Sequence, residues 1–307
     1  MLKKKLLAAL AGFTALAALP AVAYAQAAPQ AAPAPAAKDA DPAIWVVKDA
    51  DTTIYLFGTV HVLKPGLSWF DEAVKAAFDK SDTVVLEMIE PDTATMQGLI
   101  MKTAVAPATD PTLTDKLPAD KRAPYAAALA DVGIPAAALD RLEPWFAAMT
   151  LSIAPLQKLG YDPNSGAERT ITEAAKAANK EVIGLETAEQ QLGYFDGLPA
   201  DLQIKFLVNT IDEYKNAGPT LDKMVVQWAA GDPDALGATL NEEMRKTPEL
   251  AKIVLSERNA RWADWISARL AKPGTVFVAV GAGHLAGSDS VQAYLAKRNL
   301  KAERIQY

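Results

Sequence analysis

Short runs of β-branched and aromatic residues recur along the chain, and polar or glycine-containing segments separate them. The runs AIWVV and TIYLFGT flank the segment KDAD, which predicts a β-hairpin. The other runs are almost continuously apolar, as is typical of strands in a sheet covered on both faces. They predict strands at 82–88, 181–186 and 275–281, and a final edge strand at 302–307.

Between these runs, apolar positions recur at the spacing of amphipathic helices. In the segment SWFDEAVKAAFDKS, for example, apolar residues recur at helical spacing, namely Trp69, Phe70, Val74, Ala77 and Phe78. Proline and glycine interrupt the longer helical segments, and Gly160 is an expected helix end. The predicted helical segments are 69–81, 111–160, 166–180, 187–270 and 289–299.

The alternation of strands and helices predicts an α/β fold with a central mixed sheet and flanking helices. The long helical segments lie in the middle of the chain, at about 91–180 and 187–270, and are expected to form a large helical insertion. Ligands of such folds bind beyond the carboxyl ends of the strands. Residues that follow the predicted strands are therefore candidates for a functional site.

The first 25 residues have the pattern of a secretory signal peptide. Lysines at the start precede an uncharged apolar stretch and the small-residue cleavage site Ala23-x-Ala25. Cleavage after Ala25 predicts a periplasmic or secreted protein, whereas an uncleaved membrane anchor would need a longer apolar run. Residues 26–42 are rich in Ala and Pro and are expected to form a disordered tether. This leaves 43–307 as a single domain.

The composition excludes several kinds of site. The 307 residues include no cysteine, so disulfides, thiolate metal sites and thiol nucleophiles are impossible. The formal net charge is −6, and no Lys/Arg cluster alternates with aromatic residues, which argues against nucleic-acid binding. No second long apolar run follows the signal peptide, so no membrane span is expected after cleavage.

The chain has only two histidines, and both occupy the same local context. His61 closes TIYLFGTVH and His284 closes GTVFVAVGAGH, so each ends a Gly-x-x-His motif directly after an apolar run. Two glutamates also end predicted strands, Glu87 in TVVLE and Glu186 in VIGLE. The strand that ends at Glu87 is expected to lie beside the first histidine strand. Four strand ends would therefore bring two imidazoles and two carboxylates to one edge of the sheet.

Two histidines and a carboxylate are a ligand set for Zn²⁺, Mn²⁺, Co²⁺ or Fe²⁺. A metal held in this way activates its bound water and polarises a carbonyl. Glycines beside the histidines would let the chain turn off the strand and let a substrate approach the backbone. The backbone candidates are Gly58, Thr59, Gly281 and Gly283. The alternative is structural, with histidines that cap strands and glutamates in ordinary ion pairs.

Arg258 interrupts an apolar stripe of the predicted helix 248–270. The other positions of that stripe are Leu250, Val254, Trp262 and Ile266. A partly buried arginine needs a carboxylate or an anionic substrate group, so Arg258 is a candidate site residue, as are its neighbours Glu257 and Asn259. The alternative is an arginine that snorkels at the edge of the stripe.

Five stretches resemble the TraB/GumN family, whose animal relatives include the Tiki-type metalloproteases. They are YLFGTVHVLKPG, DTVVLEM, GLETAEQQLGYFDGLP, ERNARWADWI and FVAVGAGHLAG, and they span most of the chain after the tether. The resemblance implies a site formed by Gly58 with His61, Gly281 with His284, and Glu87. The wider fold group is similar to erythromycin esterases and to haem-binding ChaN-like proteins, so the fold alone does not assign the chemistry.

These features favour a secreted metal-dependent hydrolase that acts on a peptide or another small carbonyl substrate. His61, His284 and Glu87 would hold Mn, Co or Zn, with Glu87 as third ligand or general base, and Arg258 would stabilise an oxyanion. One alternative is a protein that binds peptide or haem without catalysis. Another is a metal-free esterase with His61 as base, although no Gly-x-Ser-x-Gly is present.

Overall fold

The computed structural model describes residues 37–307, so the predicted signal peptide and most of the predicted tether lie outside the described residues. The described part is an α/β fold whose central sheet has six strands in the order β6-β5-β7-β3-β2-β8. The sheet strands are β2 (Ile44–Lys48), β3 (Thr52–Thr59), β5 (Thr83–Met88), β6 (Glu181–Glu186), β7 (Gly274–Gly281) and β8 (Glu303–Ile305). The predicted mixed sheet is thus confirmed.

Strand directions divide the sheet into two parts. Strands β3, β7, β5 and β6 are parallel to one another. Strand β2 instead pairs antiparallel with β3 and with β8. The first pairing confirms the hairpin around KDAD, and the second confirms the final edge strand. We expected Glu87 to end the strand beside the first histidine strand, and this is wrong, because β7 lies between β5 and β3.

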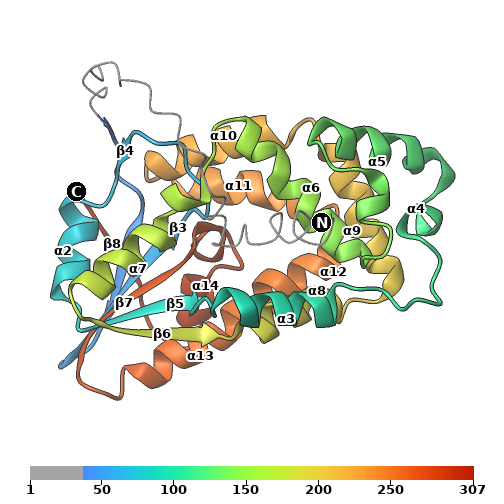
Figure 1. Cartoon of the computed structure of the whole chain (residues 1–307). Helices are drawn as coiled ribbons and strands as arrows, with labels where there is room; N and C mark the ends of the chain where they lie inside the picture. The colour runs from blue at the N-terminus through green and yellow to red at the C-terminus, as the bar shows by residue number, and fades with distance from the viewer. Residues whose placement is uncertain (1–36) are drawn as a thin grey trace.

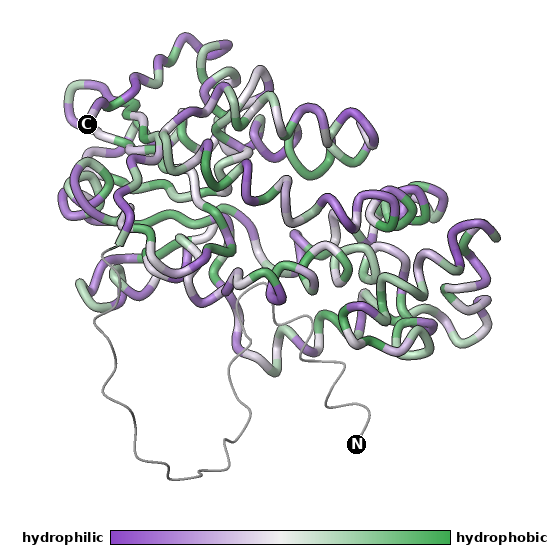
Figure 2. Tube along the Cα trace, turned by 90° about the horizontal axis from the view of Figure 1, so that it is seen from above, coloured by the Kyte–Doolittle hydropathy of each residue, from purple (hydrophilic) through white to green (hydrophobic). Residues whose placement is uncertain are grey.

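Helices cover both faces of the sheet, because alternate residues of each strand point to opposite faces. On one face, α2 (Glu72–Lys80) and α7 (Ala167–Ala177) pack on Phe57 and Phe277. On the other face, α13 (Glu257–Arg269) and α14 (Val291–Ala296) pack on strand residues such as Ile54 and Val278. Figure 2 shows the apolar strands enclosed by more polar helices.

A separate group of helices extends beyond the carboxyl ends of the parallel strands (Figure 1). Its core is built around Tyr125, Trp145 and Phe146, and Met88 at the end of β5 packs against it. Its helices are α3 (Thr93–Thr103), α4 (Leu113–Lys116), α5 (Ala119–Asp131), η3 (Ala136–Ala138), α6 (Pro144–Lys158), α8 (Ala188–Asp196) and α9 (Ala200–Glu213).

The described residues form further helices and helical turns. They are η4 (Pro163–Ser165), α10 (Ala217–Ala229), α11 (Pro233–Met244), α12 (Pro248–Ala251), the π-helical segment η5 (Lys252–Ser256) and η6 (Ala282–Leu285). No helix in the described residues is both long and apolar enough to cross a membrane.

The predicted tether is wrong at its carboxyl end. Lys38–Asp39 form β1, which pairs with β4 (Leu67–Ser68). Ala40 is 2% exposed, and the backbone N–H of Asp41 donates to the Ala229 carbonyl. These backbone hydrogen bonds order the last tether residues although their composition has no strand pattern.

Gly58 is required for packing between the two Gly-x-x-His segments, and not for a turn. It lies inside β3 opposite Val280, and a Cβ on Gly58 would be 2.9 Å from the Cα of Ala282. Gly281 likewise has a negative φ of −48°. The expected role of these glycines in a sharp turn is therefore wrong, and close approach of neighbouring atoms is their observed role.

We predict that Gly58→Ala destabilises the protein by about 1–3 kcal/mol, because the new methyl group forces β3 and η6 apart. Gly98→Ala is the matched control, since no atom lies within 4 Å of its added Cβ and alanine is favoured over glycine inside a helix by about 0.5–1 kcal/mol. Urea denaturation measures both effects. Equal stability of Gly58→Ala and wild type would contradict the packing role.

Candidate functional site

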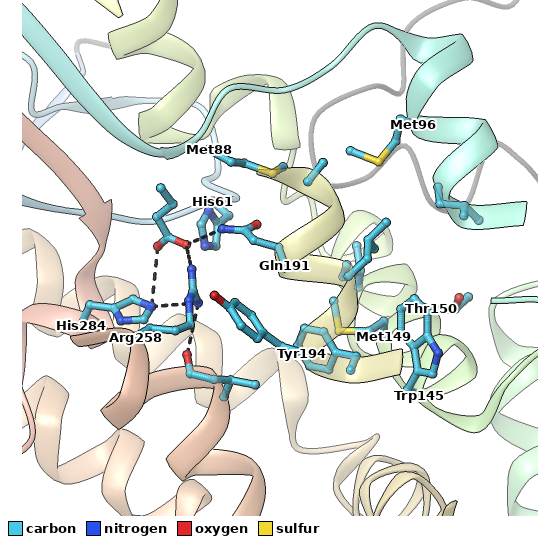
Figure 3. A pocket seen from close by; sticks show the side chains of 17 residues that line it. His61, Met88, Met96, Trp145, Met149, Thr150, Gln191, Tyr194, Arg258 and His284 are labelled. Atoms are coloured by element: carbon cyan, nitrogen blue, oxygen red, sulfur yellow. Dashed lines mark hydrogen bonds and ion pairs between the residues drawn. The ribbon is translucent and has the colours of Figure 1, made fainter. Parts of the chain in front are cut away.

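The carboxyl ends of the parallel strands place the predicted residues at one edge of the sheet (Figure 3). Thr59 at the end of β3 pairs with Gly281 at the end of β7, and Met88 pairs with Glu186. His61 follows β3, and His284 lies in η6 directly after β7. The predicted convergence of two imidazoles and two carboxylates is thus present in the structure.

Gly281 lies at the centre of this group. Measured from the position that a Gly281 Cβ would occupy, Glu87 Oε1 is 3.1 Å away, His284 Cδ2 3.5 Å and His61 Nε2 3.6 Å. The backbone N–H of Gly281 donates to Glu87 Oε1 at 2.7 Å. A side chain at this position would therefore push apart the three groups that the sequence singled out.

His284 is held as a neutral imidazole with its Nε2 available as an acceptor. Its Nδ1 lies 2.5 Å from Asn259 Oδ1, and the amide of Asn259 is oriented by a hydrogen bond from Nδ2 to the Asp289 carbonyl. Nδ1 therefore carries the hydrogen atom and donates a hydrogen bond to Asn259 Oδ1. Burial lowers the pKa of His284 to about 3, because a charged imidazole would lose its hydration.

His61 has the opposite electrostatic environment. Its Nδ1 lies 2.7 Å from Glu168 Oε1, and the negative charge of Glu168 raises the pKa of His61 to about 9, against the effect of desolvation. Because 56% of the His61 side chain is exposed, water screens this ion pair and its contribution to stability is small. Thr59 Oγ1 also donates a hydrogen bond to Glu168, so Thr59 helps to orient the carboxylate that pairs with His61.

Glycine also places Glu168 beside His61. Gly166 directly precedes α7, and a Cβ on Gly166 would clash with the backbone carbonyl of His61. The N–H of Ala167 donates to the Val60 carbonyl at 3.0 Å. The first turn of α7 thereby lies against the His61 segment.

Arg258 joins the remaining parts of the site, and all five of its N–H donors have acceptors. Nε and Nη2 donate to Glu186, and Nη2 also donates to Glu87 Oε2. Nη1 donates to the Val254 carbonyl at 3.1 Å and lies 3.2 Å from His284 Nε2. Arg258 is 8% exposed, which confirms the buried arginine with carboxylate partners that its place on the apolar stripe predicted.

Glu87 is ionised although it is buried. Burial alone would raise its pKa, but the imidazoles, the Arg258 guanidinium and the Gly281 N–H outweigh this and lower the pKa to about 2. Since His284 is itself neutral, we attribute the ionised state of Glu87 chiefly to Arg258 and the protonated His61, with a smaller contribution from the Gly281 N–H. Glu87 Oε1 lies 3.7 Å from His284 Nε2, so a carboxylate and an unprotonated imidazole nitrogen lie side by side in the site.

Two residues of α8 complete the network, and neither was predicted from the sequence. Gln191 Nε2 donates to Glu87 Oε2 at 3.2 Å and to Glu186 Oε2 at 3.1 Å. Tyr194 OH donates to Glu186 Oε1 and accepts from Arg261. Both residues occur in the quoted stretch GLETAEQQLGYFDGLP, where their spacing of three residues from each other, on one face of the helix that follows Glu186, was the available signal.

Two predicted residues lie outside this constellation. Glu257 is exposed and lies 3.7 Å from Lys252, so it faces away from Glu87. A Cβ on Gly283 would face Leu240, so this glycine adjoins α11 and not the group around Gly281.

The site contains side chains that commonly bind metal ions, but in the described residues they are not arranged as a preformed metal site. Both histidines have Nδ1 fixed by an oxygen acceptor, as is usual for metal-ligating imidazoles, and Glu87 supplies a carboxylate. Within residues 37–307, however, no group of three or more His, Cys, Asp or Glu is arranged to hold a metal ion. Arg258 accounts for part of this, because it contacts both Glu87 and His284 Nε2.

We predict that the two histidines of the metal-free protein titrate far apart in an NMR pH series. The His61 imidazole should keep its proton above pH 7, and His284 should stay neutral down to about pH 5, because their pKa values shift in opposite directions. Glu168→Gln should bring His61 back toward 6.5, and Glu173→Gln on the same helix is the control. Two histidines with similar pKa values would contradict this electrostatic description.

Comparison with known proteins identifies the family. The model of the TraB/PrgY/gumN family matches residues 43–304. The "Uncharacterized protein YbaP" of Escherichia coli K12 and that of Shigella flexneri are each 32% identical over 151 residues, 49% of this chain and 55% of the relative. The chain thus spans about half the length of these curated relatives.

A protein of Treponema pallidum is 22% identical over 281 residues, which cover 83% of this chain and 80% of that protein. No solved structure matches, so the similarity to erythromycin esterases and ChaN-like proteins stays a prediction. The family match covers residues 43–304 and with them every residue of the site described above, and the chain therefore belongs to the TraB/PrgY/gumN family.

Proposed function

We propose that this protein is a metal-dependent hydrolase that cleaves a peptide bond at the group formed by His61, Glu87 and His284. The observation that carries the proposal is the arrangement of the two imidazoles. Each is fixed through Nδ1 by an oxygen acceptor, and each lies with Glu87 Oε1 around Gly281. Imidazoles that serve as ligands are held in this way, which sets the tautomer and orients the ring.

A divalent ion such as Mn²⁺, Co²⁺ or Zn²⁺ would be held by His61, His284 and Glu87, and when bound it would activate water and polarise the scissile carbonyl. His284 Nε2 then has to give up its contact with Arg258 Nη1. His61 has to lose the proton that Glu168 stabilises on its ring. Both changes cost free energy, so we expect metal affinity to depend on these two partners.

The other residues of the site orient and polarise these groups. Arg258 keeps Glu87 ionised, so that Glu87 can act as third ligand or as the base that accepts a proton from the attacking water. Because Nε and Nη2 of Arg258 donate to Glu186 and Glu87, we assign Arg258 a positioning role. Gln191 holds Glu87 and Glu186 together through one amide group.

A metal-free esterase is the second candidate, and the pairing of His61 with Glu168 favours it. A carboxylate bonded to Nδ1 is the usual orienting partner of a histidine base. A pKa of about 9 for His61 nevertheless leaves the imidazole protonated at neutral pH, where it is a poor base. We therefore rank this function below the metal-dependent one. Export by the predicted signal peptide would place either activity in the periplasm or outside the cell.

The proposed activity is tested with internally quenched peptides and chelator-treated protein. We expect hydrolysis to require added Mn²⁺, Co²⁺ or Zn²⁺, and Glu87→Gln to lower kcat/KM by about 10²–10⁴-fold, because an amide is neither a base nor a strong ligand. Glu257→Gln, at an exposed position, should behave as wild type. Cleavage without metal would favour the esterase reading, and peptide binding without cleavage would favour a binding protein.

Metal binding itself is predicted to need both histidines. Calorimetric titration of Mn²⁺, Co²⁺ or Zn²⁺ into chelator-treated protein should show no binding for His61→Ala or His284→Ala. Asn259→Ala should weaken binding by about 10–100-fold, because it removes the partner that orients His284. Far-UV circular dichroism checks that each variant is folded. Binding of wild-type affinity in either histidine variant would contradict a shared metal site.

A further inference from the structure

Two hollows open on either side of the site and share some of its residues. The first, which we call the methionine cavity, has a volume of about 190 Å³, and the second, the charged hollow, has a volume of about 360 Å³. His61, Glu87, Met88 and Gln191 line both of them. A molecule that reaches Glu87 can therefore extend in two directions.

The methionine cavity is apolar apart from the site residues at its inner end. Its walls include Met88, Met96, Ile100, Trp145, Met149 and Phe195, and Figure 3 shows the three methionines and Trp145 extending away from His61 and His284. Thr150 also lines the cavity, but its hydroxyl is already bonded to the Phe146 carbonyl. Methionine side chains adapt to apolar groups of different shape, so these walls suit an apolar group of variable outline.

The charged hollow differs in that ionised side chains border it. Arg169, Glu173 and Lys176 reach it from α7, and Glu90 reaches it from the segment after β5. Charges of both signs suit polar main-chain and side-chain groups, whereas an apolar chain would desolvate them without compensation. The charged hollow also has apolar walls, among them Leu86, Ile89 and Val182. The two hollows therefore differ in the charged side chains that border one of them, and both have apolar walls.

We infer that the site takes a peptide with a large apolar residue next to the scissile bond. The side chain of that residue fills the methionine cavity, and the rest of the peptide continues through the charged hollow. This inference rests on the proposed hydrolase function and adds its substrate class. The residue fits the cavity as methionine, leucine or phenylalanine, since burial of such a side chain among apolar walls is favourable.

Ala188 offers a way to test the cavity without touching the catalytic groups. It lines the cavity, is 6% exposed and is the first residue of α8. Ala188→Leu should fill part of the cavity. Ala200→Leu is the matched control, because Ala200 is the first residue of α9, is exposed and does not line the cavity.

The experiment compares internally quenched peptides that differ only in one residue, methionine or alanine, with metal present. Wild type and Ala200→Leu should cleave the methionine peptide with a kcat/KM at least about 10-fold higher. Ala188→Leu should lose most of this preference, because its kcat/KM should fall more on the methionine peptide than on the alanine peptide. Equal cleavage of both peptides by wild type, or equal losses on both in Ala188→Leu, would overturn the inference. So would cleavage of long-chain acyl esters but of neither peptide.

Failure of the hydrolase proposal is recognised separately by calorimetry with N-acetyl-methioninamide and N-acetyl-alaninamide. If no peptide is cleaved but wild type binds the methionine compound more tightly than Ala188→Leu does, the cavity assignment stands and the catalytic proposal fails. If wild type and Ala188→Leu bind the two compounds alike, the cavity assignment is wrong whatever the activity.

Discussion

The buried guanidinium of Arg258 is the interaction on which the rest of the site depends. It lies 8% exposed among the ends of β5 and β6, the π-helical turn η5 and the segment η6, and it bonds to a group from each. Removing one partner of a buried ion pair typically costs about 3–5 kcal/mol. Because every N–H donor of Arg258 has an acceptor, Arg258 fixes four segments of the chain relative to one another. These segments form the walls of the site.

The two Gly-x-x-His motifs are electrostatically unequal. His284 is buried and neutral beside the Arg258 guanidinium, whereas His61 is more than half exposed and is paired with the carboxylate of Glu168. The same motif therefore supplies a neutral His284, whose Nε2 can accept a hydrogen bond, and a protonated His61. His61 keeps its extra proton until a change at Glu168 or a bound ligand removes it. In the proposed hydrolase this asymmetry separates a fixed ligand from one whose binding is linked to proton release.

The sequence was informative where local pattern decides the outcome. Apolar runs located the strands, strand ends located His61, Glu87, Glu186 and His284, and a stripe with a four-residue repeat showed that Arg258 would be buried.

The partners of these residues could not be predicted in this way, because Glu168 and Gln191 reach the site only through the packing of α7 and α8. The order of strands was also hidden. Strand β7 comes last among the parallel strands in sequence but lies between β3 and β5, which placed Glu87 beside the second histidine strand. The glycines were assigned the wrong role for a similar reason, since the atoms that crowd Gly58 and Gly281 belong to distant segments.

A double-mutant cycle between Arg258 and Glu87 tests the central claim most directly. Free energies of unfolding would be measured by urea denaturation for wild type, Arg258→Lys, Glu87→Gln and the double variant. A lysine keeps the charge but cannot contact Glu87, Glu186, Val254 and His284 together. If Arg258 positions Glu87, the two effects should be coupled by about 1 kcal/mol or more, and the same cycle with the exposed Arg261→Lys should show little coupling. Additive effects of Arg258→Lys and Glu87→Gln, within about 0.5 kcal/mol, would contradict the account.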